Sequence, residues 1–149
     1  MKKSLILLTA LLALTASVWI AARPQEAKAQ EEMVKVRMIF DNQEVIIEMF
    51  DNPASKDFLS LLPFTGTFED YAGAEKISYL PRKLSSPGSG PARQAQGDFT
   101  YYAPWGNLAV FYQGFGTDGS LYILGRIISG KEKLAAMSQG FTATIEILE

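Results

Sequence analysis

The sequence predicts a mainly β fold, a barrel or a sandwich of short strands with two short helices, that forms one domain behind an N-terminal export signal. Three observations predict this class. From residue 33 onwards most of the chain alternates between apolar and other residues in short runs, turn-forming residues separate these runs, and two segments have helical periodicity. Closure into a barrel would also leave no strand edge exposed.

The first 29 residues are typical of a cleavable signal peptide. Two lysines precede an apolar run from Leu5 to Ala22, and the small-x-small stretch Ala27-Lys28-Ala29 provides a cleavage site. Pro24 interrupts a continuous helix, so we expect cleavage after Ala29, with an uncleaved membrane anchor as the alternative. We therefore expect a signal peptide over 1–29 and an exported domain over 30–149, periplasmic or extracellular, with no stable membrane anchor after cleavage.

Composition excludes several kinds of chemistry. Residues 1–29 contain four of the 14 basic residues and one of the 16 acidic residues, so residues 30–149 hold 10 against 15, a net charge of −5. An acidic domain argues against a nucleic-acid partner. Cysteine and histidine are both absent, which excludes disulfide scaffolds, Ser-His and Cys-His nucleophile pairs, and thiolate or imidazole zinc sites. We expect neither a metal nor a cofactor.

The alternating runs predict the strands and their turns. Turn residues Asp41-Asn42-Gln43 join the first two runs into a hairpin, and residues 85–91, rich in serine, glycine and proline, predict a surface loop. That loop is either a linker within the domain or a flap over a site. The predicted strands lie in Met33–Phe40, Glu44–Phe50, Phe64–Glu69, part of Tyr71–Leu80, Asp98–Ala103, Asn107–Tyr112, Leu121–Ile128 and Phe141–Leu148.

Two segments predict helices. Asn52 and Pro53 are typical of an N-cap and a first helical residue, and residues 54–62 place Phe58 and two leucines on one face before Pro63. The second segment, residues 130–137, is a short helix that begins at a glycine.

A glycine-rich run resembles a nucleotide-binding loop only in its spacing. Residues 114–119 fit the pattern G-x-G-x-x-G, which in a dinucleotide site precedes a helix. Here the run leads into the strand predicted from Leu121. We therefore interpret it as a glycine-rich loop between two strands.

Aromatic and basic residues provide the candidates for a site. Phe99 and Tyr101 share one face of their strand, whereas Tyr102 lies on the other, so one face is core and the other is a possible binding wall. Trp105 lies in a predicted turn, where exposure is expected. Arg126, inside an apolar strand, must either face solvent or have a partner. Asp98, Glu69 and Asp70 are candidate acids, but their spacing indicates no catalytic pair.

Four stretches resemble the small bacterial cyclophilin-like domain proteins: residues 51–58, 80–84, 97–108 and 124–127, of which the third is the most specific. The resemblance extends over nearly all of residues 33–149. It implies a mainly β fold, a closed cyclophilin-like β-barrel with two short helices.

The similarity to cyclophilin prolyl isomerases lies mainly in the order of the elements. Their Phe-His-Arg and Gln-Gly-Gly runs have no counterpart here, so no catalytic residue is carried over and the catalytic residues stay unknown. The leading hypothesis is a noncatalytic module that binds a peptide or a small molecule. The alternatives are a divergent peptidyl-prolyl cis-trans isomerase of the cell envelope, in which an arginine polarises the prolyl nitrogen, and a structural module of an envelope assembly. The candidate ligand-binding residues are Arg82, Tyr102, Trp105, Phe111 and Arg126.

Overall fold

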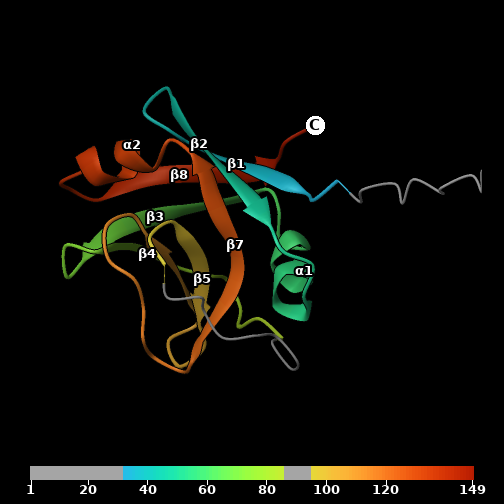
Figure 1. Cartoon of the computed structure of the whole chain (residues 1–149). Helices are drawn as coiled ribbons and strands as arrows, with labels where there is room; N and C mark the ends of the chain where they lie inside the picture. The colour runs from blue at the N-terminus through green and yellow to red at the C-terminus, as the bar shows by residue number, and fades with distance from the viewer. Residues whose placement is uncertain (1–31, 86–94) are drawn as a thin grey trace, which may run out of the picture. The chain divides into compact units, whose positions relative to one another are not determined.

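A computed structural model of the chain describes residues 32–85 and 95–149. The predicted signal peptide over 1–29 and the predicted loop at 85–91, except Ser85, lie outside the described residues. Figure 1 shows the elements in chain order: β1 (Lys35–Phe40), β2 (Gln43–Met49), α1 (Pro53–Leu59), β3 (Phe64–Tyr71), β4 (Glu75–Tyr79), β5 (Asp98–Tyr102), β6 (Asn107–Phe111), β7 (Leu121–Ser129), α2 (Lys131–Ala136) and β8 (Phe141–Ile147).

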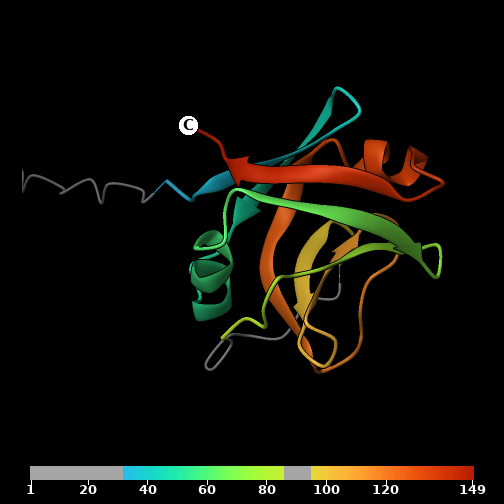
Figure 2. The same cartoon turned by 180° about the vertical axis from the view of Figure 1, so that it is seen from behind.

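The strands form a closed antiparallel barrel in the order β1-β2-β7-β5-β6-β4-β3-β8, with β8 pairing back to β1. Figure 2 shows the long strands β3 and β8 side by side on the back of the barrel, where Phe64 pairs with Ile145 and Phe68 with Phe141. The predicted fold class is therefore confirmed, and the barrel is the correct choice between barrel and sandwich. Closure pairs every described strand on both sides, which removes the exposed edges of an open sheet.

The first hairpin has the local geometry that its sequence predicts. Asp41 and Asn42 have φ values of 46° and 58°, the left-handed conformation that a tight two-residue turn requires and that these residue types tolerate. The strands alternate in burial on both sides of the turn. The turn is one residue shorter than predicted, because Gln43 already pairs with Phe40.

The first helix begins as predicted and ends early. The Asn52 side chain accepts a hydrogen bond from the Ser55 amide at 2.9 Å, and Pro53 is the first helical residue. The helix stops at Leu59, not at residue 62, because the next turn tightens: the amide of Leu61 bonds the carbonyl of Phe58 at 2.9 Å.

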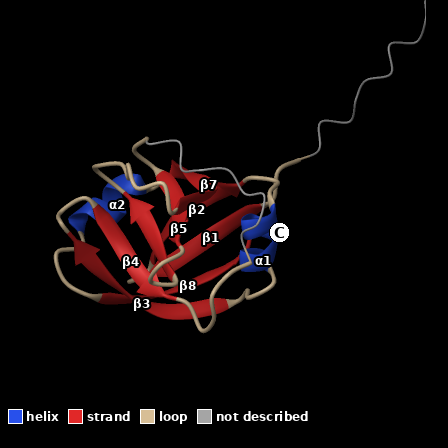
Figure 3. Cartoon of the chain, turned by 90° about the horizontal axis from the view of Figure 1, so that it is seen from below, coloured by secondary structure: helices blue, strands red, loops and turns tan. Residues whose placement is uncertain are grey.

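One apolar core fills the barrel and continues beneath both helices, which lie at opposite ends of the barrel in Figure 3. Helix α2 contributes Leu134, which is fully buried, and α1 contributes Phe58. Alternation along each strand sends every second side chain into this core. The largest fully buried side chains are Tyr101, Phe58, Phe68, Lys76, Phe99, Met38, Ile47, Leu108, Leu124, Leu134, Ile145 and Val36.

A second, smaller cluster lies on the outer face of the wall formed by β4, β6 and β5. Here Ala109, Phe111 and Leu121 are buried, with Ile77 and Tyr102 packed against them. Their neighbours in sequence, such as Leu108 and Val110, face the barrel interior, so β6 is buried on both of its faces. This outer cluster forms the floor of the site described next.

Candidate functional site

A cleft of about 360 Å³ opens on the outer face of β4, β6 and β5. The strand register forms its floor, since Glu75 on β4 pairs with Phe111 on β6, and Asn107 on β6 pairs with Tyr102 on β5. The turn after β3, the turn after β5 and the loop before β7 form its rim. We call this site the aromatic cleft, because its lining includes Tyr71, Tyr102, Trp105, Phe111 and Phe115.

Trp105 stands between two tyrosines at the rim. Its ring meets Tyr71 at a centroid distance of 5.8 Å and 82°, and Tyr102 at 5.4 Å and 84°. Edge-to-face pairs of this kind fix ring orientation. The turn that presents Trp105 closes when the amide of Gly106, with a φ of 72°, donates to the carbonyl of Tyr102 at 2.9 Å. The indole is nevertheless 48% exposed.

The glycine-rich run at 114–119 forms another wall of the aromatic cleft. As predicted, it is a loop that leads into β7. A Cβ on Gly116 would lie 2.1 Å from Leu121 Cδ1 and 2.8 Å from Phe111 Cζ, so the missing side chain lets the loop approach the floor. The glycines therefore shape the cleft by close packing.

The carboxyl of Glu75 is the most perturbed titratable group of the cleft. It is half-buried, and burial together with the negative charge of Asp70 raises its pKa to about 7 from an ordinary 4.5. Within residues 32–85 and 95–149 its side chain has no hydrogen-bond or ion-pair partner. A carboxyl that titrates near neutrality in a concave site is a functional candidate.

Two further acceptors line the aromatic cleft. The carboxylate of Asp118 accepts hydrogen bonds from the Ser120 amide at 2.7 Å and the Tyr102 hydroxyl at 3.3 Å, and the Ser120 bond is the main reason that its pKa is lowered. Asn107 is 2% exposed, and its Nδ2 donates to the carbonyl of Leu108. Its Oδ1 has no partner within the described part of the chain. Such an orphaned acceptor is costly to bury, and a buried water would satisfy it.

An ionic cluster lies next to Glu75, centred on the buried Lys76 of β4 and the partly exposed Asp70 of β3. The ammonium of Lys76, whose side chain is 1% exposed, bonds Asp70 at 2.9 Å and lies 4.7 Å from the centre of the Tyr112 ring. Hydrogen bonds from the Tyr112 hydroxyl and from Lys76 lower the pKa of Asp70. Asp70 therefore stays ionised, and its charge disfavours ionisation of Glu75.

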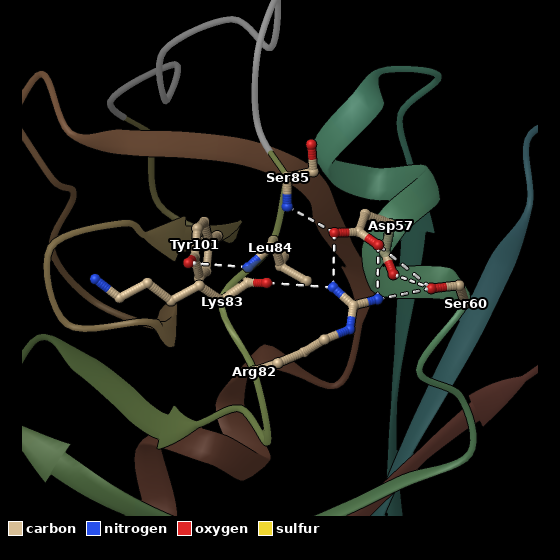
Figure 4. A network of polar contacts seen from close by, with 7 residues as sticks. All are labelled: Asp57, Ser60, Arg82, Lys83, Leu84, Ser85 and Tyr101. Atoms are coloured by element: carbon tan, nitrogen blue, oxygen red, sulfur yellow. Dashed lines mark hydrogen bonds and ion pairs between the residues drawn. The ribbon is translucent and has the colours of Figure 1, made fainter.

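Of the five predicted site residues, Tyr102, Trp105 and Phe111 come together in the aromatic cleft. Arg82 does not. Figure 4 shows its guanidinium bonding both carboxylate oxygens of Asp57 on α1, at 2.7 and 2.9 Å, while the Ser85 amide donates to the same carboxylate at 2.6 Å. This pairing, led by the Arg82 hydrogen bonds, holds the pKa of Asp57 at about 2.

Arg126 also lies outside the aromatic cleft. Its register partner across the β2–β7 pair is Glu48, and the two side chains form an ion pair with an N–O distance of 3.3 Å. The sequence left two alternatives for Arg126, exposure to solvent or a partner. The side chain has both, since it pairs with Glu48 and is 47% exposed.

Sequence reasoning missed the polar half of the cleft. Glu75 lies in the stretch 71–80, where the pattern indicated only a turn and a short strand, and Asp118 lies inside the glycine run. A signal existed for Glu75: the alternation of Glu75, Ile77 and Tyr79 puts this glutamate on the same strand face as an apolar residue. Nothing in the sequence placed that face opposite Trp105.

Neither metal ligation nor a membrane span is found in the described part of the chain. Among residues 32–85 and 95–149, no three acidic side chains gather in a way that could hold a metal ion. Over the same residues, no helix is both long and apolar enough to cross a membrane.

Comparison with known proteins agrees with this architecture. Residues 38–146 match the model of the Cyclophilin-like family. The fold is similar to the solution structure of the hypothetical protein AF2241 from Archaeoglobus fulgidus, with a TM-score of 0.63 and 15% identity over 81% of this chain and 99% of that one. It is also similar to the crystal structure of the Mimivirus cyclophilin, with a TM-score of 0.52 and 12% identity over 77% and 87%. No curated protein sequence matches the chain. At such identities, the two structures show a shared fold.

Proposed function

Since the chain belongs to the Cyclophilin-like family, we propose that its barrel is a noncatalytic binding module that holds a peptide or a small molecule in the aromatic cleft. Fold does not determine activity, so the proposal depends on the site itself. Concave sites with aromatic walls and a few converging polar groups are the usual form of ligand pockets.

The observation that carries the proposal is the gathering of exposed aromatic side chains. Tyr71, Trp105 and Phe115 are each between 44% and 54% exposed, and all three line the one cleft. Exposed apolar rings grouped in this way leave a contiguous surface in contact with water, which is typical of an interaction site. The edge-to-face contacts of Trp105 fix the orientation of its ring before a ligand binds, so that binding costs little side-chain entropy.

The contacts of the two candidate arginines favour binding over prolyl isomerisation. An isomerase of the cyclophilin type would place a guanidinium against the prolyl nitrogen in an apolar pocket. Arg82 is bound to Asp57 and Arg126 to Glu48, and no described arginine or lysine lines the aromatic cleft. Neither side chain can act there without giving up its partner.

Binding can be tested through the indole of Trp105. The chain has two tryptophans, and Trp19→Phe in the full-length protein leaves Trp105 as the only reporter. We expect at least one member of a panel of proline-containing peptides and small metabolites to change its emission. No change across the panel would contradict the proposal.

Two exposed tyrosines provide a matched pair of variants. Tyr71→Ala removes a ring that contacts Trp105, whereas Tyr79→Ala removes an even more exposed ring that does not line the aromatic cleft. We expect the first to weaken binding of the panel member and the second to leave it unchanged. Acceleration of cis-trans exchange in a test peptide, lost in Arg82→Ala, would instead favour the isomerase.

Export is the second part of the proposal. Cleavage after Ala29 would leave the whole barrel intact, because β1 begins at Lys35. We expect the protein recovered from the producing cells to lack residues 1–29 and to be found outside the cytoplasm. A mass that retains residues 1–29 would favour an uncleaved anchor.

A further inference from the structure

The aromatic cleft offers acceptors and π faces, and no cation from the described residues. Its charged members are Glu75 and Asp118, both of them carboxylates. Aromatic faces attract cations through their quadrupole, most strongly for tryptophan and tyrosine. The charge and the ring faces therefore favour the same kind of ligand.

On the premise that the proposed function holds, we infer that the aromatic cleft recognises an organic cation that carries N–H donors, an alkylammonium or guanidinium group. The cation lies against the Trp105 and Tyr71 rings, with the Glu75 carboxylate as its counter-ion. The same chemistry is presented by a free amine and by a lysine or arginine side chain of a peptide.

The geometry gives the two carboxylates different roles. Asp118 is already committed to the Ser120 amide and the Tyr102 hydroxyl, so it anchors the loop and one ring while adding negative charge. Glu75 has no such commitments among the described residues. Its carboxylate is therefore the group that is free to bind a ligand donor directly.

Recognition of a cation by Glu75 makes binding depend on pH. Four titratable groups lie around it: Asp70 and Tyr71 on β3, Tyr102 on β5, and Asp118 on the loop before β7. Two more, Lys76 and Tyr112, bond Asp70. Asp70 raises the pKa of Glu75, and Lys76 is occupied by Asp70 and by the carbonyl of Met137. A bound cation favours the ionised carboxylate, so binding releases a proton.

The expected size of this effect follows from the fraction of protein that is competent to bind. With a pKa of about 7, the Glu75 carboxyl is mostly neutral near pH 6 and mostly ionised near pH 8. Affinity for a ligand that needs the ionised form rises by up to about tenfold over that range. An alkylammonium keeps its own charge throughout, so the change reports the protein.

The experiment titrates the full-length Trp19→Phe protein with n-butylammonium and with n-butanol at about pH 6, 7 and 8. Trp105 emission and the indole NMR signal report binding. A capped peptide with a central lysine, and the same peptide acetylated on that lysine, distinguish a peptide side chain from a free amine. We expect both cations to bind more tightly as the pH rises and both neutral analogues to bind weakly at every pH.

Charge-matched variants assign the effect. Glu75→Gln removes the proposed counter-ion, whereas Glu69→Gln removes the same charge from the neighbouring strand outside the cleft. We expect Glu75→Gln to weaken cation binding and abolish its pH dependence, and Glu69→Gln to keep both. A lysine peptide that binds much more tightly than n-butylammonium would identify a peptide as the source of the cation.

The outcomes separate this inference from the proposed function. If the neutral analogues bind as well as the cations, or if Glu75→Gln and Glu69→Gln weaken cation binding equally, the inference is wrong while the cleft remains a binding site. If neither these probes nor the wider panel changes the Trp105 signals, the binding function itself fails.

Discussion

Replacing Glu75 by glutamine should change how stability depends on pH, even without a ligand. Burial, and to a lesser degree Asp70, raises the pKa of the Glu75 carboxyl in the folded protein from 4.5 to about 7. The folded state therefore binds this proton more tightly than the unfolded chain does. Its contribution to stability is fully present below pH 4.5 and is lost as the pH rises through about 7.

The magnitude follows from the difference between the two pKa values. From 4.5 to about 7 is about 2.5, which would correspond to about 3.4 kcal/mol at full strength. The Glu75 side chain is only half-buried, and solvent screens part of the effect, so we expect about 1–2 kcal/mol. For a domain of this size that amounts to a shift in Tm of roughly 3–10 °C.

Urea denaturation of the wild type and of Glu75→Gln between about pH 4 and pH 8 measures the effect. The free energy of unfolding of the wild type should fall relative to that of the variant as the pH rises, by the amount given above. Glu69→Gln, an exposed change on β3, is the control and should follow the wild type at every pH. A difference between wild type and Glu75→Gln that stays constant with pH would refute the reasoning.

Three other substitutions test contacts that stabilise the barrel. Lys76→Met removes the charged hydrogen bond between the buried ammonium and the partly exposed Asp70 carboxylate, and should lower the free energy of unfolding in urea by about 1.5–3 kcal/mol; an unchanged midpoint would contradict this. Gly125→Ala puts a Cβ 2.4 Å from the carbonyl oxygen of Glu48 on β2 and should lower the free energy of unfolding by about 1–3 kcal/mol, measured by thermal unfolding. A variant as stable as the wild type would contradict the close approach of β7 to β2. In the wild type, stability should fall as the pH drops from 3.8 through about 2, because the carboxylate of Asp57 that bonds Arg82 becomes protonated. Asp57→Asn should lack this part of the loss. Acid unfolding curves that coincide for the two proteins would argue against the pairing.

Local features were largely predictable from the residues alone. The left-handed turn at Asp41 and Asn42, the cap at Asn52, and the strand runs all depend on neighbours within a few positions. Helix α1 is the instructive difference, because its apolar spacing continues to residue 62 while its backbone stops at Leu59. Leu61 and Leu62 still pack against the core, so the pattern reported their burial correctly but not their conformation.

The sequence predicted Tyr102, Trp105 and Phe111 of the aromatic cleft, but neither Tyr71 nor its acidic residues. Tyr102 and Trp105 are close in sequence, and strand alternation with a turn is enough to bring them to one face. Glu75 and Asp118 are far from them along the chain. The β4–β6 register brings Glu75 to the cleft, and the β5–β7 pairing of Tyr102 with Leu121 brings the loop that carries Asp118, and no local pattern encodes either pairing.

The partners of the two candidate arginines could not be predicted from the sequence either. Sequence position made both arginines candidates: Arg82 lies beside the loop predicted at 85–91, and Arg126 lies inside an apolar strand, where it needs solvent or a partner. Which partner it finds is a matter of tertiary structure: Asp57 on α1 for one, and Glu48 across β2 and β7 for the other.

By itself, the sequence determined a mainly β domain without cysteine or histidine chemistry, because period-2 patterning, turn residues and composition act locally and need no knowledge of the fold. The tertiary structure alone decided which strands pair to close the sheet, that the arginines are engaged elsewhere, and that a glutamate lies in the same cleft as Trp105 with a pKa near neutrality. Those outcomes depend on long-range pairing and on burial, which arise only when distant segments meet.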